Sequence, residues 1–137
     1  MKQKTMKKPD CPFCSPDVEQ DILVENELAY VIYDRFPVNT GHILVIPRVH
    51  QGNFFELPER TRDACMSLLR EAMSMVSERF HPDGFNVGIN IGEAAGQTID
   101  HVHIHLIPRY TGDVEFPRGG VRGVIPDKRD YLDSGAC

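Results

Sequence analysis

Three histidines alternate with aliphatic residues late in the chain, and their spacing is suited to chemistry. Residues 101–107 read His-Val-His-Ile-His-Leu-Ile and hold three of the six histidines of the chain. In an extended strand successive side chains point to opposite faces, so His101, His103 and His105 are predicted to share one face about 6.6 Å apart. A plain solvent-facing strand carries Thr, Lys or Glu more readily than three imidazoles. Imidazole serves either as a zinc ligand or as a nucleophile that accepts a nucleotidyl group, so the pattern leaves two kinds of site open.

A pair of cysteines near the N-terminus offers a second group of chemically active side chains. Cys11-Pro12-Phe13-Cys14 is a CxxC motif whose two sulfurs can form half of a tetrahedral zinc site or a redox pair. No helical pattern follows Cys11, which disfavours the redox interpretation. Two ligands alone do not make a zinc site, and the other two have to come from elsewhere in the chain.

The loop immediately before the histidines contains small residues and uncharged polar side chains. It reads Gly92-Glu93-Ala94-Ala95-Gly96-Gln97-Thr98, and small residues let main-chain amides approach a phosphate closely. Taken alone, such a segment is an ordinary hairpin connection. Because it leads directly into the histidines, it is predicted to place amide donors where charge develops on phosphate oxygens.

Composition limits the class of protein and its partners. The chain has 137 residues, 41% hydrophobic and 26% charged, which is typical of one soluble domain with a core. A net charge of −5 argues against a surface for nucleic acid. The lysine-rich start, residues 1–8, is not followed by an apolar run, and no segment approaches transmembrane length, so neither a signal peptide nor a membrane partner is expected. Four cysteines without a secretory signal indicate a reducing compartment and predict a cytoplasmic location.

The pattern along the chain predicts the elements that position these residues. Alternating and apolar stretches predict strands over 22–25, 28–34, 42–47, 85–91 and 101–107, and a stripe of apolar residues predicts one long helix over 58–80. The stretch 43–46 is apolar throughout, which predicts a central strand covered on both faces. We expect a flexible basic tail over 1–10, one domain over 11–126 that ends in an irregular arm rich in Gly, Pro and Arg, and a mobile tail over 127–137.

These motifs together resemble the histidine triad (HIT) family of nucleotide hydrolases and transferases. The heptad 101–107 matches the family pattern throughout, and the resemblance runs from Cys11 to about Tyr110, including the strand 41–47. The stretches 95–98 and 108–109 are most similar to the diadenosine polyphosphate hydrolase branch. A histidine at position 105, where the nucleotidyltransferases have glutamine, favours a hydrolase. The resemblance implies an α+β fold with a five-stranded antiparallel sheet and one long helix, paired into a homodimer.

The resemblance also implies roles for individual residues. His103 is expected to attack the α-phosphorus of a nucleotide and form a covalent nucleotidyl-histidine, with His105 and His42 beside the phosphate oxygens. Asp34 falls where the family binds the ribose. The remaining substrate-binding residues are expected to be Phe13, Ile22 and Tyr33 at the base, and Asn90, Gly96, Gln97 and Thr98 on the phosphate side.

In some family members, and in the related uridylyltransferases, two histidines complete a zinc site begun by a CxxC pair. The matching positions here are His50 and His101, so the resemblance implies one structural zinc per chain held by Cys11, Cys14, His50 and His101. Such a metal would link the N-terminal segment to the strand of the nucleophile.

The expected substrate is a dinucleoside polyphosphate such as diadenosine tetraphosphate. Three alternatives stay open: a purine nucleoside phosphoramidate hydrolase, a non-catalytic nucleotide-binding regulatory module, and a zinc protein in which all the histidines are ligands. Arg118 and Arg122 lie in the C-terminal arm, which in the family often approaches the active site of the partner subunit and could select the leaving group.

Overall fold

The structure is a computed structural model that describes residues 7–130 of the chain. It contains a five-stranded sheet and one long helix, α1 (Glu59–Phe80). The strands are β1 (Val24–Glu25), β2 (Ala29–Tyr33), β3 (Ile43–Pro47), β4 (Gly84–Ile89) and β5 (Ile104–Arg109). The predicted helix and strands are therefore present, with boundaries within a few residues of those expected. The predicted mobile ends lie largely outside the described residues and stay predictions.

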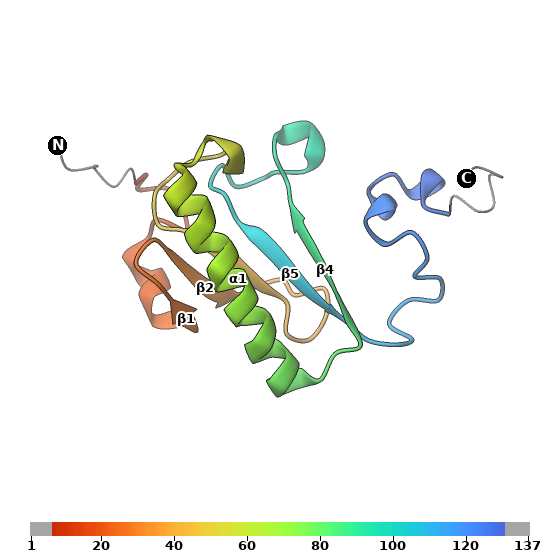
Figure 1. Cartoon of the computed structure of the whole chain (residues 1–137). Coiled ribbons are helices and arrows are strands. Elements are labelled where there is room, and N and C mark those ends of the chain that lie inside the picture. The colour runs from red at the N-terminus through yellow and green to blue at the C-terminus, as the bar shows by residue number, and fades with distance from the viewer. Residues whose placement is uncertain (1–6, 131–137) are drawn as a thin grey trace.

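The sheet has the order β1-β2-β3-β5-β4, and all neighbouring strands are antiparallel. The hairpin of β4 and β5 returns so that β5 lies between β3 and β4, with Ile104 opposite both Val45 and Ile89. Figure 1 shows α1 crossing one face of this sheet. The α+β class with a five-stranded antiparallel sheet is thus confirmed.

Both faces of the sheet centre are covered by apolar side chains. Every residue of β3 is buried, as predicted from its continuous apolar run. On the helix side, the buried stripe of α1 packs against alternate strand residues; it consists of Cys65, Leu68, Leu69, Ala72 and Val76. On the other side, Leu44 and Ile46 pack against residues of the N-terminal segment, including Phe13 and Val18. The N-terminal segment therefore acts as the second cover of the sheet.

The histidine heptad is only partly a strand, which corrects the predicted strand over 101–107. β5 begins at Ile104, and His101 to His103 precede it in a loop with a bend at His101. The reason lies in the hydrogen bonding, because the N–H of Val102 donates to the carbonyl of Gln51 at 2.7 Å instead of joining the strand ladder. Within β5 the side chains alternate between the two faces of the sheet as predicted: Ile104 and Leu106 are buried, and His105 points to the opposite face.

The C-terminal arm continues from β5 as loops and two short 3₁₀ helices, Gly120–Val124 and Pro126–Lys128. Figure 1 shows it extending past β4, away from α1. The start of the arm is fixed by Arg109, whose Nε and Nη2 each donate to the Asp113 carboxylate at 2.8 Å. This paired geometry holds the pKa of Asp113 well below its usual range. Within residues 7–130, no helix combines the length and the apolar character needed to cross a membrane.

Candidate functional site

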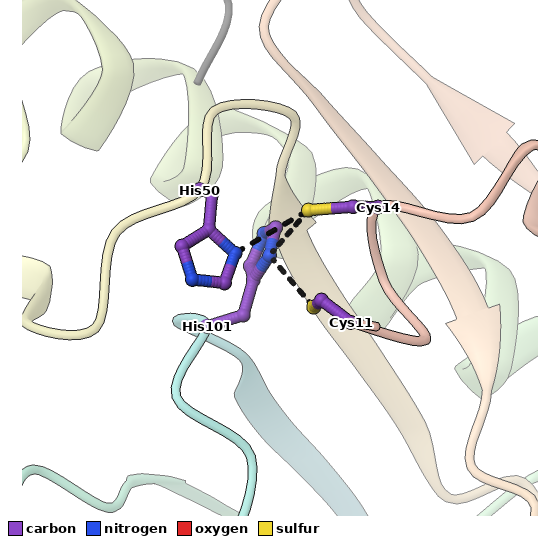
Figure 2. Close-up of side chains that lie close together, drawn as sticks. All are labelled: Cys11, Cys14, His50 and His101. Atoms are coloured by element: carbon purple, nitrogen blue, oxygen red, sulfur yellow. Dashed lines mark hydrogen bonds between the residues drawn. The ribbon is translucent and has the colours of Figure 1, made fainter. Parts of the chain in front are cut away.

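Two cysteines and two histidines from three separate segments meet near the end of β3. Figure 2 shows their side chains pointing toward a common centre. Nδ1 of His101 lies 3.4 Å from Sγ of Cys11 and 3.5 Å from Sγ of Cys14, and Nδ1 of His50 lies 3.3 Å from Sγ of Cys14. All four ligand atoms lie within 4.8 Å of one another. The structure therefore brings together the four residues predicted to bind zinc.

The geometry and chemistry of this cluster fit zinc. Tetrahedral bonds of about 2.3 Å to sulfur and 2.0 Å to nitrogen imply sulfur-to-nitrogen distances of about 3.5 Å, close to those found here. Burial lowers the pKa of His101 to about 4, which keeps its ring neutral. Its Nε2 lies 2.8 Å from the carbonyl oxygen of Pro47, so Nε2 carries the proton and Nδ1 presents a lone pair to the sulfurs.

The second histidine of the heptad has a similarly fixed tautomer. Nδ1 of His103 lies 2.8 Å from the main-chain carbonyl oxygen of His101. A carbonyl only accepts hydrogen bonds, so Nδ1 carries the proton, and in the neutral ring Nε2 keeps an unshared electron pair. This is the form of imidazole that can attack an electrophilic phosphorus.

The third histidine of the heptad is paired with His42 from the start of β3. The main-chain N–H of Val38 donates to Nδ1 of His42 at 3.1 Å, which places the proton of the neutral ring on Nε2. That Nε2 lies 3.0 Å from Nδ1 of His105 and donates to it. His105 therefore carries its own proton on Nε2, and this N–H can donate to a phosphate oxygen.

Burial keeps both members of this pair neutral. It lowers the pKa of His105 to about 4, with the neighbouring rings of His103 and His42 adding to the shift and the Asp34 carboxylate opposing it. Burial also lowers the pKa of His42, again against the effect of Asp34. Oδ2 of Asp34 lies 3.3 Å from Nε2 of His42 and 3.9 Å from Nδ1 of His105.

Asp34, His42 and His105 also lie close enough together to suggest a second metal site. The tautomer of His42 argues against a metal ion at this position. Because Val38 donates to Nδ1 of His42, Nε2 of that ring bears a proton and offers no lone pair to a cation. The histidines thus divide into a metal-type group and a separate group suited to phosphate chemistry, which disfavours the interpretation that all of them are ligands.

A pocket of about 450 Å³ opens beside His103 and His105. Seven of its lining residues were predicted to act in the site: Phe13, Asp34, Asn90, Gly96, Thr98, His105 and the nucleophile candidate His103. The ring of Phe13 lies 5.2 Å from the ring of His103, measured between centroids. Apolar side chains make up much of the remaining lining, which suits a flat, weakly polar group such as a nucleobase.

Comparison with known proteins agrees with this geometry. Residues 15–112 match the model of the HIT domain, which is more than half of the chain. The chain belongs to the HIT family. An uncharacterised HIT-like protein of Saccharolobus solfataricus is 33% identical over 129 residues, covering 90% of each chain. The AP-4-A phosphorylase of Mycobacterium tuberculosis is 31% identical over 101 residues, which cover 73% of this chain and 52% of that protein.

A solved HIT-family structure bears on the metal cluster. The zinc-bound histidine triad family protein of Mycobacterium smegmatis is 32% identical in sequence and superposes with a TM-score of 0.64. The match covers 92% of this chain and 97% of that protein's chain. The HIT-domain match itself begins at residue 15, just after the two cysteines. A zinc-bound member of the family and the Cys11, Cys14, His50 and His101 cluster are consistent with a zinc site in this HIT protein.

Three predicted pocket residues lie elsewhere in the HIT fold. Tyr33 packs on the helix side of the sheet, with its ring 6.3 Å from that of Phe80, because its position in β2 points it away from the pocket. Ile22 packs against the cluster beneath the N-terminal segment without lining the pocket. The side chain of Gln97 does not line the pocket. Its Oε1 accepts from the N–H of Gly92 in the same loop, and its Nε2 donates to the carbonyl of Gly52 in the segment after β3, each at 2.8 Å.

Sequence reasoning missed several apolar pocket residues of this HIT domain. They are Pro12, Val18, Ile32, Phe36, Val38, Leu44 and Ile99. Ile32 and Leu44 are opposite one another in β2 and β3, and the alternation of those strands places them on the face away from α1. That shared face is a signal that the strand pattern could have given. Val18 lies in a short 3₁₀ helix, Pro16–Asp21, and Phe36 in a bend, and neither is long enough for a periodic pattern to predict it.

Proposed function

We propose that the protein is a nucleotide hydrolase that acts at the α-phosphate through a covalent intermediate on His103. The observation that carries this proposal is the contact between Nδ1 of His103 and the carbonyl of His101, which in the neutral ring leaves the Nε2 lone pair free beside a pocket of about 450 Å³. Membership of the HIT family supports the same reaction class.

The reaction has two steps. In the first, Nε2 of His103 bonds to the α-phosphorus while the bond to the leaving group breaks, and the leaving group departs with that electron pair and takes a proton from solvent. In the second, a water oxygen bonds to phosphorus, the phosphorus–nitrogen electrons return to Nε2, and a proton passes to solvent. The N–H of His105 stabilises the charge on the phosphate oxygens in both steps.

Dinucleoside polyphosphates such as diadenosine tetraphosphate are the first proposed substrates. The base would lie among the apolar residues near Phe13 and the ribose beside Asp34. Gly96 and Thr98 line the pocket on the side of the glycine-containing loop, where small residues leave room for phosphate. Similarity to a protein named AP-4-A phosphorylase supports this substrate class.

A purine nucleoside phosphoramidate is the second candidate, and the distribution of cations favours it. Among the described residues that line the pocket, Arg35 is the one Lys or Arg; its side chain is 71% exposed and lies 3.6 Å from Asp21. A neighbouring cavity of about 430 Å³ shares His105 and Asn90 and is lined by no Lys or Arg of residues 7–130. A long polyphosphate leaving group needs cations, whereas an amine does not.

We also propose one structural zinc per chain, held by the four residues of the Cys/His cluster. The zinc, when bound, supplies a cross-link between the N-terminal segment and the main chain beside His103 and takes no part in the reaction. The fit of the four ligand atoms supports this assignment.

A homodimer is proposed as the working form of the protein. β4 is an end strand of the sheet, and exposed aliphatic side chains gather on it and on the neighbouring arm; they are Val87, Val121, Val124 and Ile125. Unpaired strand edges and apolar patches are covered in stable proteins, and a second copy of the chain can cover both.

The covalent intermediate gives the test of the proposed function. Protein mixed with adenine nucleotide substrate labelled at the α-phosphate, then quenched within one turnover, should carry label that is stable to alkali and lost in acid. His103→Ala should bind nucleotide without becoming labelled. A panel of diadenosine polyphosphates and adenosine phosphoramidate ranks the leaving groups. A wild-type protein that binds nucleotide but turns over none of these substrates would support the regulatory module instead.

A further inference from the structure

The segment 11–14 belongs to two sites at once. Cys11 and Cys14 direct their sulfurs into the metal cluster, while Pro12 and Phe13 between them line the nucleotide pocket. Phe13 is buried, and its ring centroid lies 5.7 Å from that of the metal-side His101 as well as 5.2 Å from that of His103. A single short turn therefore separates the proposed zinc ligands from a side chain that contacts the proposed nucleophile.

Few hydrogen bonds fix this segment on the sheet. The N–H of Cys14 donates to the carbonyl of Cys11, a contact within the segment itself. Among the contacts of residues 7–130, one hydrogen bond that does not involve sulfur joins the segment to the sheet, from the Oη hydroxyl of Tyr30 to the carbonyl oxygen of Phe13 at 2.7 Å. The position of Phe13 thus depends strongly on where the two flanking sulfurs are held.

The metal-side segment around His50 is connected to the pocket as well. The carbonyl of Gly52 accepts from Nε2 of Gln97 at 2.8 Å, and Gln97 in turn accepts from the N–H of Gly92. These contacts fix the loop that contributes Gly96 and Thr98 to the pocket. Each of the three segments that meet at the metal cluster therefore also orders part of the pocket.

We infer that zinc binding at the Cys/His cluster and nucleotide binding in the pocket are positively coupled, and that Phe13 carries most of the coupling. The inference rests on the proposed nucleotide site. Zinc fixes the segment 11–14 and so places Phe13 against the bound nucleotide; a bound nucleotide in turn holds Phe13 and so favours the cysteine geometry that zinc needs. Binding linkage requires the two effects to be equal, and we expect a factor of about ten.

The test uses the zinc-loaded protein and AMP, which carries the base, ribose and α-phosphate of the proposed substrates. Zinc release to an excess of a chromophoric chelator is followed with and without saturating AMP. We expect AMP to reduce zinc release about tenfold, and zinc removal to weaken AMP binding by the same factor in calorimetry. Circular dichroism confirms that the metal-free protein is folded. The zinc-release measurement starts from the zinc-loaded protein, so it is valid even if the metal-free protein is unfolded.

Two variants locate the coupling. Phe13→Leu keeps all four metal ligands, and its zinc release should no longer respond to AMP. Val38→Ala is the matched control, because Val38 also lines the pocket but belongs to a segment without a ligand of the Cys/His cluster, so its zinc release should still slow with AMP.

The outcomes separate this inference from the proposed function. If AMP binds but leaves zinc release unchanged in the wild type, the coupling is overturned while the nucleotide site stands. A full response in Phe13→Leu overturns the role of Phe13. If AMP does not bind the zinc-loaded protein, the proposed nucleotide site fails and the coupling fails with it.

Discussion

Nε2 of His42 lies 3.0 Å from Nδ1 of His105, and this contact sets the proton on the ring that faces the pocket. His42 is itself oriented by the N–H of Val38. A main-chain amide thus determines, through two imidazoles, which nitrogen of His105 can donate to a phosphate. His42 acts as a positioning residue for His105.

Replacing His42 should therefore reduce turnover more than nucleotide binding. In His42→Ala the His105 ring loses its donor and can take the other tautomer, so we expect kcat to fall about 100-fold with a small change in KM. Steady-state kinetics measure both constants. A variant whose KM rises while kcat is retained would assign His42 to substrate binding.

The low pKa of His105 predicts a loss of stability in acid. Its folded pKa of about 4 lies below the ordinary value of 6.5, so the unfolded chain binds more protons between these values. The contribution of His105 is complete above about pH 6.5 and is lost as the pH falls toward 4, at up to about 1.4 kcal/mol per pH unit.

Urea unfolding across this pH range measures the effect. In His105→Gln the fall of the unfolding free energy between pH 6.5 and 4 should be shallower than in the wild type. Equal slopes in the two proteins would show that His105 titrates alike in the folded and unfolded chains.

The elements of this fold could be predicted because they depend on local periodicity. The stripe that includes Leu68 and Val76 marked the helix, and the apolar run of β3 marked a strand buried on both faces. The start of β5 could not be predicted in the same way. Whether Val102 joins the strand ladder depends on the carbonyl of Gln51, a contact that forms only when distant segments meet.

In the site, too, some residues could be predicted from the sequence and others depend on contacts between distant segments. The resemblance to the HIT family placed the four metal-type ligands, and the structure brings them together. Alternation alone would have separated Tyr33 from the pocket residue Ile32, since adjacent strand residues face opposite ways. The role of Gln97 required the structure, because its side chain donates to the carbonyl of Gly52, a residue 45 positions earlier in the chain.

Loss of a ligand of the proposed zinc should destabilise the whole domain. Cys14→Ser should purify without stoichiometric zinc and melt about 10 °C or more below the wild type, since structural zinc contributes directly to folding free energy. Metal analysis and calorimetry test this. Cys65→Ala is the matched control, because Cys65 is buried on α1 and outside the metal cluster, so this variant should keep its zinc.

Asp34 should distinguish ribose from deoxyribose. If its carboxylate accepts from the ribose hydroxyls, Asp34→Ala should weaken AMP binding about tenfold or more and weaken 2′-deoxy-AMP binding less. Calorimetric titration of both ligands gives the comparison. Equal losses for the two ligands would show that Asp34 acts through its contacts with His42 and His105 and not through the 2′-hydroxyl.

The proposed dimer predicts that charges on the β4 and arm surface will separate the subunits. Val87 and Val124 are 39% and 80% exposed, so Lys at either position should be tolerated in the monomer. In an interface, the same Lys would be buried without a partner at a cost of several kcal/mol, and we expect the dimer dissociation constant to rise at least about 100-fold. Phe55→Lys is the control, since Phe55 is 69% exposed and belongs to the 3₁₀ helix Phe54–Glu56, which is part of neither β4 nor the arm. Light scattering during gel filtration should give a dimer for the wild type and Phe55→Lys and a monomer for Val87→Lys and Val124→Lys. A wild type that is monomeric at all concentrations would overturn the proposed dimer.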